Sequence, residues 1–157
     1  MNTIHIPSTA TKEERYKALV PLIKALLDHE RDIIANMANV AAAIKEVFSF
    51  WWVGFYKVKG KMLVLGPFQG PVACTRIAYG KGVCGTAWAT GEVQIVPDVE
   101  LFPGHIACSA RSKSEIVLPV KKNGKVVAVL DIDSEHLHTF DETDRRYLEE
   151  IVFLLDF

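Results

Sequence analysis

The feature of the sequence that most constrains the fold is a β-hairpin predicted in the second half of the chain. Two runs rich in β-branched residues, 116–120 and 126–134, flank the dipeptide Asn123-Gly124. Asn-Gly is favoured in tight two-residue turns because both positions there adopt positive φ angles, and such turns join neighbouring antiparallel strands. The chain is therefore expected to contain an antiparallel sheet.

A second hairpin is predicted in the first half of the chain from its aromatic residues. The run 50–58 is followed by a turn at Gly60 and by the apolar run 62–68, and aromatic and β-branched residues favour strands. Trp51 and Trp52 are adjacent, so on a strand they should point to opposite faces of the sheet. One of them is expected in the core or a pocket, and the other against the helices or in solvent.

Helical patterns occur at both ends of the chain. Thr11 and Glu14 form a capping box before the first pattern, which Pro21 should kink or divide. A second helix is expected over 32–48, and a closing helix after Asp141. The residues expected to face inward are Tyr16, Leu19, Val20, Ile23, Leu26 and Leu27, then Ile33, Ile34, Met37, Val40, Ala41, Ile44 and Val47, and finally Tyr147, Leu148, Ile151, Val152 and Leu155.

These elements together predict an α+β fold. Short strands are expected just after Cys74 and over 93–99, with a short helix that ends at Gly91 between them. A central antiparallel sheet should carry the terminal helices on one face and a loop-covered pocket on the other. Since half of the 157 residues are apolar, the chain should form one domain over residues 1–157.

The charge of the chain limits its partners. The formal net charge is −1 and no Lys/Arg cluster is present, so neither nucleic acid nor an anionic membrane is an expected partner. The N-terminal segment lacks the basic and apolar regions of a signal peptide, and no apolar run is long enough to span a bilayer. The sequence therefore predicts a soluble, cytoplasmic protein. In that reducing compartment, three cysteines favour a transient, catalytic disulfide over permanent ones.

All three cysteines lie in one loop-rich stretch. Cys108 is followed by Arg111 and Lys113, and a nearby cation lowers the pKa of a thiol. Cys108 is therefore the candidate nucleophile. Cys84 comes just before a predicted short helix, whose backbone N–H groups could also stabilise a thiolate. The alternative for each cysteine is an ordinary buried position, which free cysteine often occupies.

Acidic residues indicate a pocket on one face of the predicted sheet. Asp131 and Asp133 are two residues apart on the return strand, so they should share a face, with Leu130 and Ile132 on the other. Burying such carboxylates without partners is costly, so the pair is either a solvated strand end or part of a pocket. Together with Glu115 the pair suggests a pocket for a ligand with a cation or several N–H donors, such as the ammonium of a free amino acid.

Several motifs carry a family resemblance that extends over essentially the whole chain. They are WWVGFY, GPFQGPVACTRI, GKGVCGTAW, FPGHIACSARSKSEIVLPV and LDIDSE. Together they resemble the GAF-domain free methionine-(R)-sulfoxide reductases. The resemblance implies that Cys108 attacks the sulfoxide, that Cys74 is its resolving partner and that Cys84 is an additional thiol. The pocket residues that it implies are Trp52, Glu115, Asp131 and Asp133.

The activity implied by the resemblance is the thiol-dependent reduction of free L-methionine (R)-S-oxide to L-methionine. Cys108 attacks the sulfoxide sulfur while a carboxylic acid, whose pKa is raised by its acidic neighbours, donates a proton. Cys108 becomes a sulfenic acid and condenses with Cys74 to a disulfide. The resemblance implies that thioredoxin then reduces this disulfide, and it is compatible with a homodimer. No cofactor and no metal are expected.

Two other classes of function remain open at this point. A GAF domain can be a sensor that binds a small molecule without catalysis, although the absence of an output module and the three grouped cysteines argue against it. Alternatively, the three cysteines and His105 could bind zinc. Their spacing, however, lacks the close Cys-x-x-Cys pairs that are typical of structural zinc sites.

Overall fold

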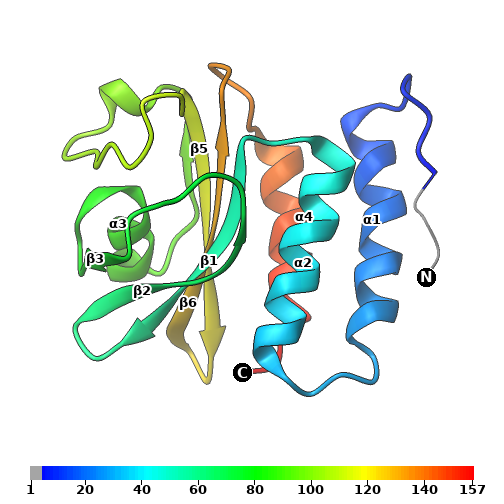
Figure 1. The fold of residues 1–157 in the computed structure, drawn as a ribbon, viewed down its shortest axis with the longest axis horizontal. Coiled ribbons are helices and arrows are strands. Elements are labelled where there is room, and N and C mark those ends of the chain that lie inside the picture. The colour runs from blue at the N-terminus through cyan, green and yellow to red at the C-terminus, as the bar shows by residue number, and fades with distance from the viewer. Residues whose placement is uncertain (1–4) are drawn as a thin grey trace.

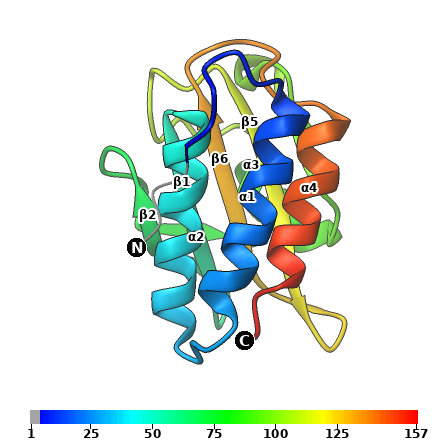
Figure 2. The same ribbon diagram turned by 90° about the vertical axis from the view of Figure 1, so that its right-hand side faces the viewer.

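A computed structural model of the protein describes residues 5–157 and contains three long helices, a short helix and one six-stranded sheet (Figures 1 and 2). The helices are α1 (Lys12–Leu27), α2 (Ile33–Phe48), α3 (Gly82–Thr90) and α4 (Glu142–Phe153). The strands are β1 (Trp52–Lys59), β2 (Met62–Gln69), β3 (Arg76–Ala78), β4 (Gln94–Val96), β5 (Ser114–Lys122) and β6 (Lys125–Ser134), and a single 3₁₀ turn, Val99–Leu101, follows β4.

The sheet separates a helical layer from a pocket layer. Its strand order is β3-β2-β1-β6-β5-β4, and each neighbouring pair is antiparallel. On one face α2 and α4 lie against the strands, and α1 packs against both helices (Figures 1 and 2). On the other face α3 lies across β5 and β6. The predicted α+β architecture is therefore confirmed.

The capping and turn residues predicted from the sequence are found at the boundaries of these elements. The side chain of Thr11 accepts a hydrogen bond from the backbone N–H of Glu14, whose carboxylate accepts one from the N–H of Thr11. At the predicted tight turn Asn123 and Gly124 have φ angles of 52° and 77°, as a two-residue hairpin turn requires. Pro21 lies inside α1, which runs unbroken from Lys12 to Leu27, so the proline does not divide the helix.

The apolar core between the sheet and the helices contains nearly all of the side chains predicted for it. Leu130 and Ile132 of β6 are fully buried there, because they point toward the helices while Asp131 and Asp133 point away. Two predictions were wrong: the side chains of Leu26 and Ile34 are 36% and 59% exposed. They lie at the end of α1 and the start of α2, on either side of a connection whose residues 28–32 are all exposed.

A buried carboxylate ties the first helix to the last. Asp144 is fully buried in α4, and its Oδ1 accepts a hydrogen bond of 2.6 Å from the hydroxyl of Tyr16 in α1. Its Oδ2 pairs with Lys12 Nζ at 2.5 Å. Burial, followed by the Asp144 charge, raises the pKa of Tyr16. A buried charge is tolerated only when it is paired in this way, so this contact fixes how α1 and α4 pack.

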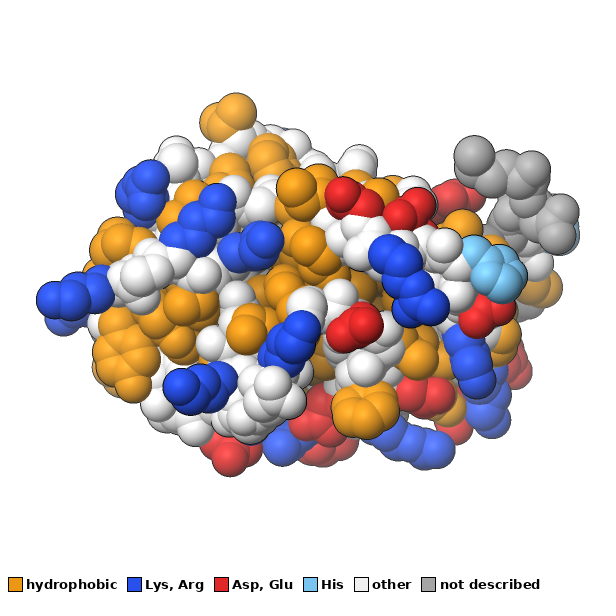
Figure 3. All heavy atoms as spheres, turned by 90° about the horizontal axis from the view of Figure 1, so that it is seen from below, with side chains coloured by type: hydrophobic (Ala, Val, Ile, Leu, Met, Phe, Trp, Pro, Cys, Tyr) orange, Lys and Arg blue, Asp and Glu red, His pale blue; other side chains and the backbone are white. Residues whose placement is uncertain are grey.

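The surface is mixed in character. Seen from below, basic side chains are scattered over both the sheet side and the helical side of the molecule, and the acidic ones lie mainly toward the helices (Figure 3). Among the helices of the described residues, none has the length and apolar character needed to cross a membrane.

Candidate functional site

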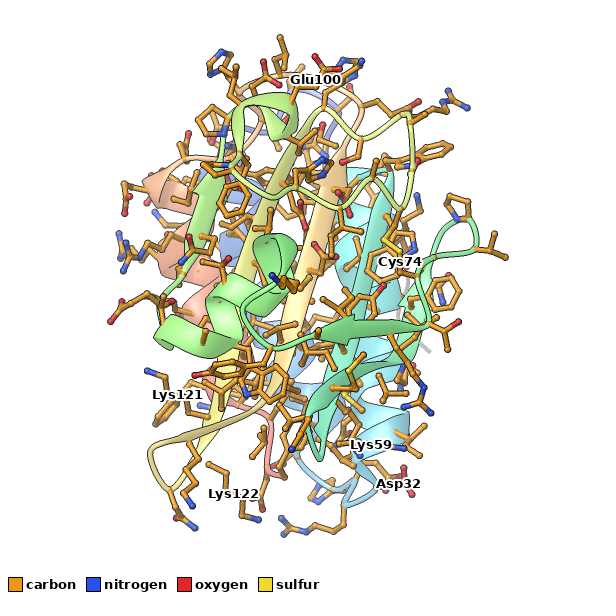
Figure 4. All side chains as sticks on the ribbon, turned by 90° about the vertical axis from the view of Figure 1, so that its left-hand side faces the viewer. Asp32, Lys59, Cys74, Glu100, Lys121 and Lys122 are labelled. Carbon is orange, nitrogen blue, oxygen red and sulfur yellow. A yellow bond between two sulfur atoms is a disulfide. The ribbon has the colours of Figure 1, made fainter. Side chains whose placement is uncertain are left out.

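A pocket opens on the face of the sheet opposite the long helices, and Figure 4 looks onto this face. Its cavity volume is about 50 Å³, enough for a few water-sized groups. Carboxylates of β5 and β6 form its floor, and aromatic side chains from β1 form a wall. The segments that contain Cys74 and Cys108 lie at its mouth, where Figure 4 shows the Cys74 side chain.

The antiparallel register of β5 and β6 brings the three predicted acids together. Glu115 lies opposite Asp133, and Asp131 points into the pocket from the same face of β6. Burial, followed by the charges of the two aspartates, raises the pKa of Glu115 well above its usual value. Burial also raises the pKa of both aspartates, and the Asp131 charge adds to the effect at Asp133. The prediction that these carboxylates form a pocket rather than a solvated strand end is therefore supported by their geometry.

The two aspartates differ in their partners. Asp133 accepts a hydrogen bond of 2.5 Å from the hydroxyl of Ser112, which lies just before β5. Asp131 is only 6% exposed, and its Oδ1 has no hydrogen-bond partner among the described residues. An unpaired buried acceptor of this kind costs about 1 to 3 kcal/mol. The pocket therefore contains a carboxylate oxygen that is free to bind a ligand.

Both adjacent tryptophans line the pocket, so the prediction that they point to opposite faces of the sheet was wrong. Trp52 is the first residue of β1, and its Nε1 donates a hydrogen bond to the Pro71 carbonyl at 3.0 Å. Trp51 precedes the strand, so the alternation of a strand does not apply to it. Its Nε1 donates to Ser109 Oγ at 3.3 Å, in the loop that contains Cys108.

Gly54 has a role that reasoning from the sequence missed. It lies opposite Asp131 in the β1–β6 pairing. A Cβ atom at this position would lie 2.4 Å from both the Trp52 ring and Phe68 Cβ. Only glycine therefore leaves room for the Trp52 ring over the strand. A glycine inside a strand pattern is the signal that could have revealed this close approach.

Tyr56 is a second pocket residue that the sequence reasoning missed. It is buried, and its hydroxyl donates a hydrogen bond of 2.9 Å to the backbone carbonyl of Cys74. Burial, followed by the charges of the acidic residues, raises the pKa of Tyr56. Since Trp52, Gly54 and Tyr56 alternate along β1, they share the pocket face. This spacing could have placed Tyr56 in the pocket.

Cys74 and Cys108 form a disulfide across the mouth of the pocket, with their Cα atoms 5.5 Å apart. This separation is normal for a disulfide. It joins the segment after β2 to the loop before β5, which are distant in the sequence. The bond is the pairing that the family resemblance implied. Two of the four ligands of the alternative Cys/His zinc site are used in this bond, so the oxidised structure does not offer that site.

The expectation that a helix end stabilises a Cys84 thiolate was wrong. Cys84 lies in the first turn of α3, is only 4% exposed, and faces Asp131 and Glu115. Burial, followed by these two acidic neighbours, raises the pKa of Cys84 well above its usual value. Desolvation and like charge therefore outweigh the helix end.

The cation predicted to activate Cys108 has other partners in this structure. The guanidinium of Arg111 pairs with Glu135 at 2.5 Å and lies 4.3 Å from the centre of the Trp51 ring. Lys113 is exposed. A lowered pKa for the Cys108 thiol, which is oxidised here, stays a prediction.

Comparisons with known proteins agree with this architecture. The GAF domain family model matches residues 28–157. GAF domain-containing protein A of Dictyostelium discoideum is 60% identical over 95% of each chain. The free methionine-R-sulfoxide reductase of Escherichia coli is 44% identical, over 92% of this chain and 88% of its own.

A solved structure gives the same likeness in three dimensions. The free methionine-R-sulfoxide reductase from Neisseria meningitidis, in complex with its substrate, superposes with a TM-score of 0.95 and 50% identity. The match covers 99% of this chain and 93% of that one. The similarity therefore extends over the helices, the sheet and the pocket.

Proposed function

This chain belongs to the GAF-domain free methionine-R-sulfoxide reductases, which are oxidoreductases, and from that premise we propose that it reduces free L-methionine (R)-S-oxide with Cys108 as the nucleophile. The observation that carries the proposal is the Cys74–Cys108 disulfide at the mouth of a pocket floored by three buried acids. It supports a reaction in which one thiol takes the substrate oxygen and a second thiol displaces it.

The acidic floor supports binding of a free amino acid. The ammonium of the substrate would be the cation that pairs with the otherwise unpartnered Asp131 Oδ1. Trp52 would contact the apolar part of the substrate, since its ring lies against the same cavity. A methionine inside a protein chain has no free ammonium to pair with the acidic floor of the pocket. These features favour the free amino acid as the substrate.

The reaction needs a proton donor, and the pocket carboxyl groups have raised pKa values that suit this role. A sulfoxide sulfur becomes electrophilic when its oxygen accepts a proton or a strong hydrogen bond. Burial raises the pKa of Glu115, Asp131 and Asp133, and the charges of acidic neighbours raise the pKa of Glu115 and Asp133 further. We therefore propose that one of the three holds the proton that the reaction uses. That acid donates to the sulfoxide oxygen while the remaining carboxylates hold the ammonium.

The proposed reaction proceeds in three balanced steps. The Cys108 thiolate attacks the sulfoxide sulfur, and the protonated oxygen migrates to the Cys108 sulfur. The original sulfur–oxygen bond and the transient sulfur–sulfur bond break, so methionine leaves with its electron pair restored and Cys108 carries a sulfenic acid. Cys74 then attacks the Cys108 sulfur, which forms the disulfide and releases water. An external dithiol provides two electrons and two protons and restores both thiols.

The closed disulfide has a consequence for the cycle. In the oxidised structure the cavity holds only a few water-sized groups, so the substrate is expected to bind after the disulfide has been opened.

As the external dithiol we propose thioredoxin, acting in the cytoplasm, where a reducing environment maintains the thiols. We further propose that the protein is a homodimer.

A single-turnover experiment tests this function. Fully reduced protein is mixed with one equivalent of the R epimer, and methionine is quantified while peptides of the non-reduced protein are analysed by mass spectrometry. We expect one methionine and one Cys74–Cys108 link per chain. A Cys84–Cys108 link would exchange the roles of the two other thiols. Binding of the sulfoxide without methionine formation would instead favour the sensor function.

A further inference from the structure

The third thiol points to a ligand that the proposed reaction does not use. The Sγ of Cys84 and carboxylate oxygens of Glu115 and Asp131 all lie within 4.8 Å of one another. All three residues are buried, with exposed fractions of 4%, 6% and 6%. We propose that these three side chains form a binding site for Zn²⁺ in the pocket.

An independent observation supports a cation at this place. The Oδ1 of Asp131 is buried without a hydrogen-bond partner among residues 5–157, and it belongs to the same cluster. A buried carboxylate oxygen is stabilised most strongly by a bound cation. The cluster therefore contains an unpaired acceptor as well as three donor atoms of suitable kinds.

The distances fit a tetrahedral ion after a small adjustment. Donor atoms about 2.0 to 2.3 Å from Zn²⁺ lie roughly 3.3 to 3.8 Å from one another. The donor atoms lie within 4.8 Å of one another. The longest separation would therefore have to shorten by about 1 Å, and side-chain rotation can supply this change. A water molecule can complete the four ligands, because the cavity of about 50 Å³ has space for it.

The donor set selects the metal. Mg²⁺ and Ca²⁺ prefer sites made only of oxygen atoms, whereas a thiolate favours Zn²⁺ and similar softer ions. The three donors also come from regular elements, Cys84 from α3, Glu115 from β5 and Asp131 from β6. In Figure 4, α3 lies across these two strands. The site is therefore held by one helix and two strands, and neither cysteine of the disulfide contributes to it.

Binding of zinc would affect the enzyme. The ion would occupy the oxygen of Asp131 that we assign to the substrate ammonium, so the two could not bind together. Zinc is therefore expected to inhibit by competition with the substrate. This consequence rests on the proposed function, whereas the metal site itself does not.

The test uses Co²⁺ as the probe, because Zn²⁺ is spectroscopically silent. In the oxidised protein Cys84 is the only free thiol among the described residues, so a thiolate-to-cobalt charge-transfer band reports on it alone. We expect one Co²⁺ per chain, with visible bands typical of tetrahedral cobalt, and loss of these bands when Zn²⁺ is added. The titration involves no turnover, so it can fail or succeed independently of the proposed reaction.

Matched variants complete the test. Cys84→Ser should remove the charge-transfer band, and Glu115→Gln and Asp131→Asn should each weaken Co²⁺ binding by at least about tenfold. Glu92→Gln, which removes an exposed negative charge outside the pocket, should leave binding unchanged. The proposal is overturned if the oxidised protein shows no charge-transfer band or if the band persists in Cys84→Ser. It is also overturned if Glu115→Gln and Asp131→Asn both bind Co²⁺ as tightly as the parent protein.

Discussion

Asp131→Asn should change activity and stability in opposite directions. The side chain keeps its shape but loses its charge in a pocket where burial raises the pKa of all three acids. In the substrate complex it would lose a charge-assisted hydrogen bond, worth about 1.5 to 3 kcal/mol. At about 1.36 kcal/mol per tenfold, kcat/KM should fall by about 10- to 150-fold.

The effect on stability has the opposite sign because the free protein carries an unfavourable charge. A carboxyl whose pKa is raised on folding contributes stability that is present below its unfolded pKa and is lost as pH rises through the folded pKa. At any pH above the folded pKa of Asp131 the parent protein has lost that contribution, whereas Asn has no proton to lose. A gain of about 1 kcal/mol would raise Tm by about 2 to 4 °C. The gain should shrink in acidic buffer.

The assay is steady-state kinetics with the R epimer, together with thermal melts at neutral and acidic pH. Ile132→Ala is the matched control, because this neighbouring side chain is fully buried on the opposite face of β6. It should lower stability by about 2 to 5 kcal/mol and affect kcat/KM much less. A lower Tm together with unchanged kinetics in Asp131→Asn would refute the reasoning, because it would show that the charge stabilises the fold and does not contact the substrate.

Three further variants test other parts of the site. Cys108→Ser should abolish methionine formation even with dithiothreitol as reductant, and substantial remaining turnover would move the nucleophile to Cys84. Cys74→Ser should lose thioredoxin-dependent turnover but keep turnover with dithiothreitol, since an external thiol can replace the resolving one; equal loss with both reductants would contradict this role. Gly54→Ala should lower kcat/KM and quench or shift the fluorescence of the protein because its Cβ displaces Trp52, and unaltered values for both would show that the ring position does not matter.

Local sequence signals were sufficient for most of the fold. The capping box at Thr11 and the Asn123-Gly124 turn depend only on neighbouring residues, and both are present as predicted. The alternation along β6 also placed Asp131 in the pocket and Ile132 in the core. These features could be predicted because period and turn chemistry are properties of short segments.

The errors arose where the outcome depends on tertiary contacts. The exposure of Ile34 depends on where the first turn of α2 lies relative to the sheet, and the orientation of Trp51 depends on which residue begins β1. For Cys84 the sequence showed the helix end but not the two acids that the fold brings from β5 and β6. The need for glycine at position 54 likewise depends on the Trp52 ring that lies above it.

The most direct test of the central claim is turnover of the separated R and S epimers of free methionine sulfoxide with a thioredoxin system. The result expected is methionine from the R epimer alone, with no reduction of N-acetylmethionine (R)-sulfoxide, which lacks the ammonium that the acidic floor would bind. Equal reduction of both epimers, or equal reduction of the free and acetylated compounds, would contradict the proposed function.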